Sequence, residues 1–141
     1  MKILAVTQKV DQNDPVLGFF HRWLEEFAKH FEKITVICLE KGAYNLPSNV
    51  KGLSLGKEDG VSKLEYLGRF YKYIWREWKN YDVVFVHMNQ EYVLLGWKSW
   101  WLMTKKVYLW RNHAKGNILT RLAVFWSQKV FYTSPSSYTA R

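Results

Sequence analysis

Six short apolar segments recur along this chain, and longer amphipathic stretches separate most of them. Four of the six are almost continuously apolar and rich in valine, isoleucine and aromatic residues, which is typical of strands buried on both faces of a parallel sheet. The predicted strands span residues 2–8, 33–39, 50–55, 82–87, 106–111 and 129–134. This alternation limits the chain to folds that cover a parallel sheet with helices.

Four helices are predicted between these strands. They span residues 17–31, 62–79, 91–103 and 117–126, and Ser62 with Glu65 forms a candidate capping box for the second. The order of elements predicts an α/β three-layer sandwich with a doubly wound, mostly parallel six-stranded sheet, which is a Rossmann-like fold of strand order 3-2-1-4-5-6. At 141 residues, we expect residues 1–141 to form a single domain of this kind.

Charge and cysteine content narrow the partners and the compartment. The formal net charge is +9 and aromatic residues make up 18% of the chain, so we expect an anionic partner. Cys38 is the only cysteine and lies in an apolar run, which indicates a buried thiol and a reducing cytoplasmic setting. The apolar start of the chain is too short for a signal peptide, and no apolar stretch is long enough to span a membrane.

The helix predicted at 62–79 carries two apolar stripes. The predicted core seam is Leu64, Leu67, Tyr71, Ile74, Trp75 and Trp78, and the opposite stripe is Tyr66, Phe70 and Tyr73 among basic side chains. Exposed aromatic rings beside cations suit a membrane interface. The candidate membrane-surface residues are Arg69, Lys72, Arg76, Trp97, Trp100 and Trp101. Two alternatives remain open: the rings belong to the core or contact another domain, or the surface binds nucleic acid, which no recognised motif supports.

Polar residues follow several of the predicted strands. Ligands of an open parallel sheet bind outside the carboxyl ends of its strands. The candidates there are Gly18 after the first strand, His87 after the fourth, Arg111, Asn112 and His113 after the fifth, and Ser134 after the sixth. The glycine-rich dinucleotide fingerprint, the P-loop, the nucleophile elbow and metal-ligand spacings are all absent from the sequence, so those site classes are excluded.

Four segments together resemble the amino-terminal half of a GT-B-fold glycosyltransferase, most like glycosyltransferase family 4. They are the opening MKILAVTQ with the loop to Gly18, YDVVFVH ending at His87, WRNH ending at His113, and KVFYTS ending at Ser134. The resemblance implies that this half binds a glycan or lipid-linked acceptor. It also implies that a second half, absent here, binds most of the nucleotide-sugar donor, with no cofactor and no metal.

The resemblance also implies residue roles. His113 would be catalytic, beside the transferred sugar, and His87, Arg111, Asn112 and Ser134 would line the substrate site. Gly18 would approach the donor phosphates. This chain alone would transfer no sugar. Two other functions remain open: a non-catalytic basic α/β module that binds an anionic membrane surface or a partner chain, and the acceptor subunit of a glycosyltransferase whose donor half is a separate chain.

Overall fold

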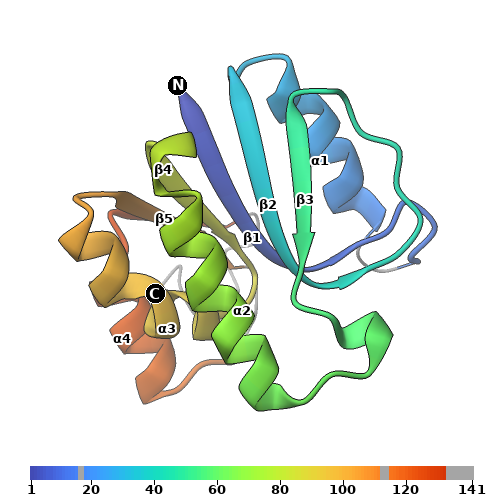
Figure 1. Cartoon of the computed structure of the whole chain (residues 1–141). Helices are drawn as coiled ribbons and strands as arrows, with labels where there is room; N and C mark the ends of the chain where they lie inside the picture. The colour runs from blue at the N-terminus through green and yellow to red at the C-terminus, as the bar shows by residue number, and fades with distance from the viewer. Residues whose placement is uncertain (16–17, 112–114, 133–141) are drawn as a thin grey trace. The chain divides into compact units, whose positions relative to one another are not determined.

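The computed structural model describes residues 1–15, 18–111 and 115–132. Its parallel strands form one six-stranded sheet in the order β3-β2-β1-β4-β5-β6 (Figure 1). The strands are β1 (Lys2–Val10), β2 (Lys33–Lys41), β3 (Val50–Ser54), β4 (Val83–His87), β5 (Lys106–Trp110) and β6 (Lys129–Phe131). The predicted doubly wound, Rossmann-like fold is therefore confirmed.

All four predicted helices are present. They are α1 (Gly18–Ala28), α2 (Lys63–Arg76), α3 (Gln90–Leu102) and α4 (Ile118–Phe125), with short 3-10 turns η1 (Lys57–Asp59) and η2 (Trp78–Asn80). Ser62 caps α2 by accepting the Glu65 N–H, as its sequence position predicts. Asn117 and Thr120 form a reciprocal capping box at the start of α4. Local sequence therefore sets where these two helices begin.

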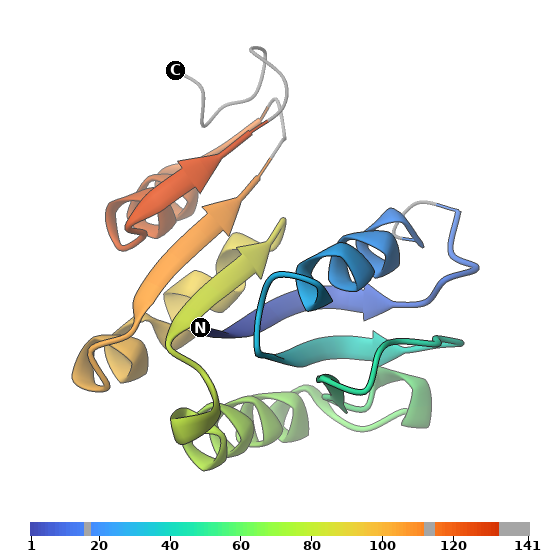
Figure 2. The same cartoon turned by 90° about the horizontal axis from the view of Figure 1, so that it is seen from above.

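The chain divides into two compact units, Met1–Asp82 and Val83–Arg141. In the first unit, α1 and α2 cover opposite faces of β1, β2 and β3 (Figure 2). The middles of β1 and β2 are buried without interruption, which explains why their sequences are continuously apolar rather than alternating. Cys38 is buried in β2, and burial raises the pKa of its thiol to about 12, so it is an inert core residue.

The stripe of α2 that was predicted to be exposed faces the sheet. Phe70 and Ile74 are 1% and 0% exposed, and the Tyr73 hydroxyl donates to the Ser54 carbonyl at 3.1 Å. The predicted core seam was wrong except at Ile74. Its other members, which lie on the exposed surface, are Leu64, Leu67, Tyr71, Trp75 and Trp78.

A buried carboxylate explains this orientation of α2. Glu77 follows the helix and accepts hydrogen bonds from Lys51 Nζ at 3.0 Å and Asn80 Nδ2 at 2.6 Å, and a longer one from Arg76 Nε at 3.3 Å. Burial alone would raise the pKa of Glu77, but these donors outweigh burial and lower it. Both stripes of α2 are apolar, so the polar contacts of Tyr73 and Glu77 decide which stripe faces the sheet.

In the second unit, α3 and α4 pack on the same face of β4, β5 and β6 (Figure 2). Trp100 of α3 is fully buried there, so its predicted place on a membrane-facing surface was wrong. The ring fits because residue 96 is glycine: a Cβ at Gly96 would overlap the six-membered ring of Trp100. Its neighbour Trp101 is exposed.

Candidate functional site

The loop that follows β1 is tied to the end of β2. Gln12 N–H donates to the Ala43 carbonyl at 2.8 Å, and Gly42 N–H donates to the Val10 carbonyl at 2.9 Å. Gly42 has no space for a side chain, because a Cβ there would overlap the Asp11 carboxylate. These contacts hold the loop over the carboxyl ends of β1 and β2, where ligands of this fold class bind.

This loop carries more negative than positive charge. The Lys9 ammonium lies 3.2 Å from the Asp14 carboxylate, 3.8 Å from Asp11 and 3.7 Å from Glu40. The hydrogen bond to Asp14 raises the pKa of Lys9, so Lys9 stays protonated. A second ammonium, that of Lys57, lies 3.8 Å from Glu40, so two cations meet three carboxylates here. The carboxylate oxygens accept hydrogen bonds from hydroxyl groups and repel phosphates.

Gly18 is buried where α1 begins. Its N–H donates to the Asp14 carbonyl at 3.0 Å, and a Cβ there would lie 3.2 Å from the Gln12 carbonyl oxygen. The glycine therefore allows the chain to approach itself closely at this turn. Because Asp11 and Asp14 precede it in the same loop, the local charge does not favour the donor phosphates that the resemblance places here.

His21, near the start of α1, is a buried histidine with two polar contacts that the sequence analysis did not single out. Its Nε2 accepts the Asn45 N–H at 3.1 Å and its Nδ1 lies 2.9 Å from the Glu25 carboxylate, so the proton is on Nδ1. The ring is buried and joins α1 to the loop between β2 and β3. His21 and Glu25 are four residues apart on a predicted helix, so the sequence indicates their contact. No nearby sequence feature indicates the contact with Asn45.

In the second unit, two aromatic side chains stack where β4 and β5 end. His87 and Trp110 are register partners, and their rings lie 5.1 Å apart with an angle of 11° between the planes. His87 is 1% exposed, and burial lowers its pKa to about 4, so the imidazole is neutral at about pH 7. The neutral, buried His87 ring therefore positions Trp110 and does not offer a charge to a ligand.

The backbone after β4 adopts an unusual conformation. Met88 has a φ of 66°, a left-handed conformation that costs a non-glycine residue about 1 kcal/mol or more. Its N–H donates to the Trp110 carbonyl at 2.7 Å, which holds the turn against β5. Gln90 then begins α3, and its side-chain oxygen is buried with no hydrogen-bond partner among the described residues. Strained backbone and an unsatisfied acceptor at one strand end are features that accompany functional sites.

Arg111 joins the ends of β5 and β6. Its N–H donates to the Phe131 carbonyl at 3.0 Å, and its Nη2 donates to the Lys115 carbonyl at 2.8 Å. The guanidinium therefore ties the end of β5 to Lys115. The other predicted site residues of this unit, Asn112, His113 and Ser134, lie outside the described residues.

Two of the membrane-surface cations predicted on α2 are engaged within the first unit. Arg69 Nη2 bonds to the Glu65 carboxylate at 3.0 Å and its Nη1 lies 3.4 Å from the Leu55 carbonyl. Arg76 bonds to Glu77 and lies 5.1 Å from the centre of the Tyr73 ring. Lys72 is exposed.

Neither a metal site nor a membrane-spanning helix is found in the part of the chain that the structure describes. No group of three or more His, Cys, Asp or Glu side chains among those residues could hold a metal ion. Within the same residues, every helix is too short or too polar to cross a bilayer.

Comparison with known proteins gives structural but not sequence matches. No family model matches this chain, and no curated protein matches it. HepE of Anabaena, solved in complex with UDP, has a TM-score of 0.64 and 18% identity over 99% of this chain. WaaB, a lipopolysaccharide outer core galactosyltransferase, has a TM-score of 0.59 and 11% identity over 92% of it. The UDP-GlcNAc 2-epimerase of Methanocaldococcus jannaschii has a TM-score of 0.58 and 15% identity over 95% of it.

These similarities show a shared fold, which is that of a domain of GT-B-type glycosyltransferases and epimerases. The chain spans 40% of the HepE and epimerase chains and 38% of the WaaB chain.

Proposed function

We propose that this chain is the amino-terminal, acceptor-binding domain of a GT-B glycosyltransferase that uses a nucleotide-sugar donor. The observation that carries the proposal is the stacked pair of His87 and Trp110 at the carboxyl ends of β4 and β5. This fold binds ligands at that edge, and an indole face is a suitable platform for a sugar ring.

The loop that follows β1 is better suited to binding an acceptor than to binding the donor phosphates. Asp11, Asp14 and Glu40 surround Lys9 with acceptor oxygens, which suit the hydroxyl groups of a glycan. A nucleoside diphosphate needs cations or free backbone N–H groups instead. The donor would then be bound mainly by a second domain, as the resemblance to family 4 implies.

The roles proposed for Trp110, His87 and Arg111 are argued from geometry, and those of the other residues of the second unit come from the resemblance. Trp110 would stack on the acceptor, and His87 would hold its ring in place. His113 would be the catalytic residue beside the transferred sugar, with Asn112 and Ser134 in the same site. Arg111 would hold Lys115, which follows Asn112 and His113 in the sequence, close to the end of β5.

The test uses the gene product as its source cells make it. Its intact mass shows whether a donor domain is covalently attached, and release of nucleoside diphosphate from a panel of nucleotide sugars, with lipid and glycan fractions as acceptors, measures transfer. Trp110→Leu should lower kcat/KM for the acceptor about tenfold. Trp78→Leu, which alters an exposed tryptophan of the first unit, is the matched control and should not change kcat/KM.

The outcome separates the proposal from its alternatives. Transfer only in the presence of a copurifying nucleotide-sugar-binding chain would indicate an acceptor subunit of a two-chain enzyme. No transfer by the gene product or its copurifying partners would refute a role in glycosyl transfer. It would leave the non-catalytic α/β module, because the fold alone supports both.

A further inference from the structure

Most of the net positive charge lies in residues 83–141. Residues 83–141 contain eight lysines and arginines and one acidic residue, Glu91. Residues 1–82 contain thirteen basic and eleven acidic residues, so they are close to neutral. The second unit therefore attracts anions, because few acidic side chains of its own sequence oppose them.

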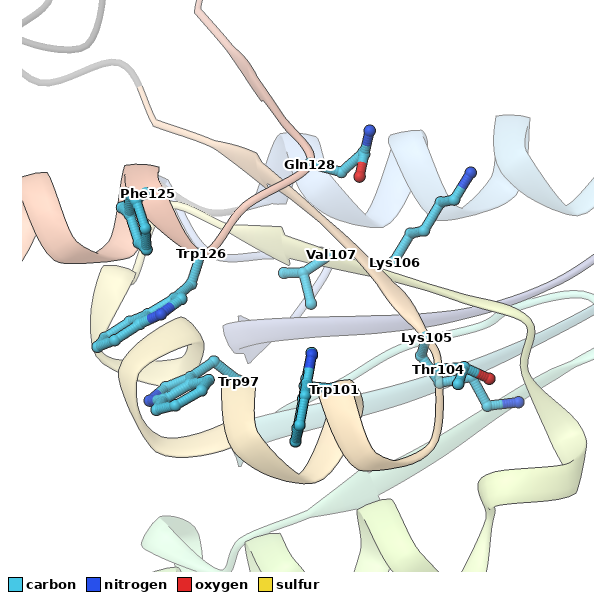
Figure 3. A pocket seen from close by; sticks show the side chains of 9 residues that line it. All are labelled: Trp97, Trp101, Thr104, Lys105, Lys106, Val107, Phe125, Trp126 and Gln128. Carbon is cyan, nitrogen blue, oxygen red and sulfur yellow. The ribbon is translucent and has the colours of Figure 1, made fainter.

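This unit also has an aromatic pocket, which we name the tryptophan pocket. Trp97 and Trp101 of α3 face Phe125 and Trp126 at the end of α4, and Val107 of β5 points into the space between them (Figure 3). The pocket encloses about 520 Å³. Trp97 and Trp126 stack face to face with their centres 4.2 Å apart, so one wall is rigid.

The rim of the pocket combines exposed apolar groups with lysines. Trp101 and Phe125 are 69% and 78% exposed, and Ile118 on the same helix as Phe125 is 65% exposed. Lys105 and Lys106, at the start of β5, also line the pocket, and their ammonium groups point away from the aromatic rings (Figure 3). Among the described residues, no acidic side chain lines it. Exposed apolar groups of this size are costly in water unless another surface covers them.

We propose that the tryptophan pocket and the outer face of α4 bind the surface of an anionic lipid bilayer. Indole rings are stable at the depth of lipid headgroups, where one end is apolar and the other is wet. Lys105 and Lys106 would meet lipid phosphates, while Trp101, Phe125 and Ile118 would enter the acyl boundary. The charge of this unit favours lipid over an apolar protein partner, because a bilayer supplies both negative charge and apolar depth.

The tryptophan pocket lies at the amino end of β5, whereas His87 and Trp110 lie at the carboxyl ends of their strands. Binding to lipid is therefore independent of the proposed transferase activity, and either can fail without the other. The proposal keeps Trp97 and Trp101 of the predicted membrane surface, adds Phe125, Ile118, Lys105 and Lys106, and leaves out the cations of α2, Arg69, Lys72 and Arg76.

The experiment measures partition of the 141-residue chain onto vesicles of phosphatidylcholine alone and of phosphatidylcholine mixed with phosphatidylglycerol. Sedimentation with the mixed vesicles should be strong and should weaken as salt is added. Acyl chains brominated near the headgroup should quench tryptophan fluorescence of the wild type and much less that of Trp101→Phe.

Matched variants locate the contact. Lys105→Gln with Lys106→Gln should weaken partition about thirtyfold, since a lysine at an anionic surface contributes about fivefold. Lys29→Gln with Lys33→Gln removes the same charge from the first unit and should have a much smaller effect. Trp101→Ser and Phe125→Ser should each weaken partition about tenfold, with unchanged unfolding midpoints because both side chains are exposed.

Four results would overturn the proposal. The first is equal partition onto both kinds of vesicle, and the second is an equal loss from Trp75→Ser, which alters the exposed stripe of α2. The third is binding to single-stranded RNA, lost steeply with salt, without binding to vesicles. The fourth is a concentration-dependent dimer that Trp101→Ser converts to a monomer, which would identify a second copy as the occupant.

Discussion

Two glycines inside helices test how far packing overrides helix propensity. Gly96 lies in α3 against the buried Trp100. Gly68 lies in α2, and apart from the local backbone of its own helix no atom lies within 4 Å of the position that a Cβ would take. Replacing either with alanine lowers the conformational entropy of the unfolded chain and improves helix propensity by about 1 kcal/mol. The two substitutions therefore share one favourable contribution and differ only in their surroundings.

The difference in unfolding free energy follows from the space at each site. At Gly68 nothing opposes the gain, so Gly68→Ala should stabilise the protein by about 0.5–1 kcal/mol. At Gly96 the added methyl overlaps the fully buried Trp100 ring. Overpacking of this kind costs about 1–3 kcal/mol, so after the helix gain of about 1 kcal/mol Gly96→Ala should destabilise the protein by up to about 2 kcal/mol.

Urea unfolding, followed by both far-ultraviolet circular dichroism and tryptophan fluorescence, measures the two free energies. The midpoints should move in opposite directions with an unchanged slope. Trp100→Leu in the Gly96→Ala background should cost less than Trp100→Leu alone, because the smaller side chain removes the overlap; a double-mutant cycle measures this coupling. A Gly96→Ala protein as stable as the wild type, with no coupling to Trp100, would show that the account of this packing is wrong.

Three further predictions concern pH and capping. The pKa of His87 is about 4 in the folded protein and about 6.5 in the unfolded chain, so the free energy of unfolding should fall by about 3 kcal/mol as the pH drops from about 6.5 to about 4. Urea titrations at several pH values measure this dependence, and His87→Phe should flatten it. The pKa of Glu77 is lowered in the folded protein, so the stability that the ionised carboxylate contributes is present above the ordinary carboxyl range and is lost as the pH falls through the folded pKa. Glu77→Gln should lower the unfolding free energy by about 1–3 kcal/mol and remove that acid dependence. Asn117→Ala should cost about 1 kcal/mol, and hydrogen exchange should show faster opening at the start of α4, whereas unchanged exchange there would contradict the capping role.

The candidate site was predictable in its position but not in its contacts. Strand ends can be read from the apolar runs, so His87 and Arg111 were expected at the ligand-binding edge. Their partners were not: the stack on Trp110 and the bond from Arg111 to Lys115 depend on side-chain orientation. His21 was missed because its partner Asn45 lies far along the chain and contacts it only through backbone.

The sequence by itself determined the number, type and order of the elements, and with them the topology. Apolar runs, capping residues such as Ser62 and the handedness of crossovers are local or general properties, so they can be read without coordinates. The tertiary structure alone decided which side chains face inward. Tyr73 and Glu77 turn α2 by bonding to β3 and its surroundings, and Gly96 makes room for Trp100 while Trp101 stays outside. Where two faces of a helix are equally apolar, hydrophobicity cannot choose between them, and the buried polar contacts and available space make the choice.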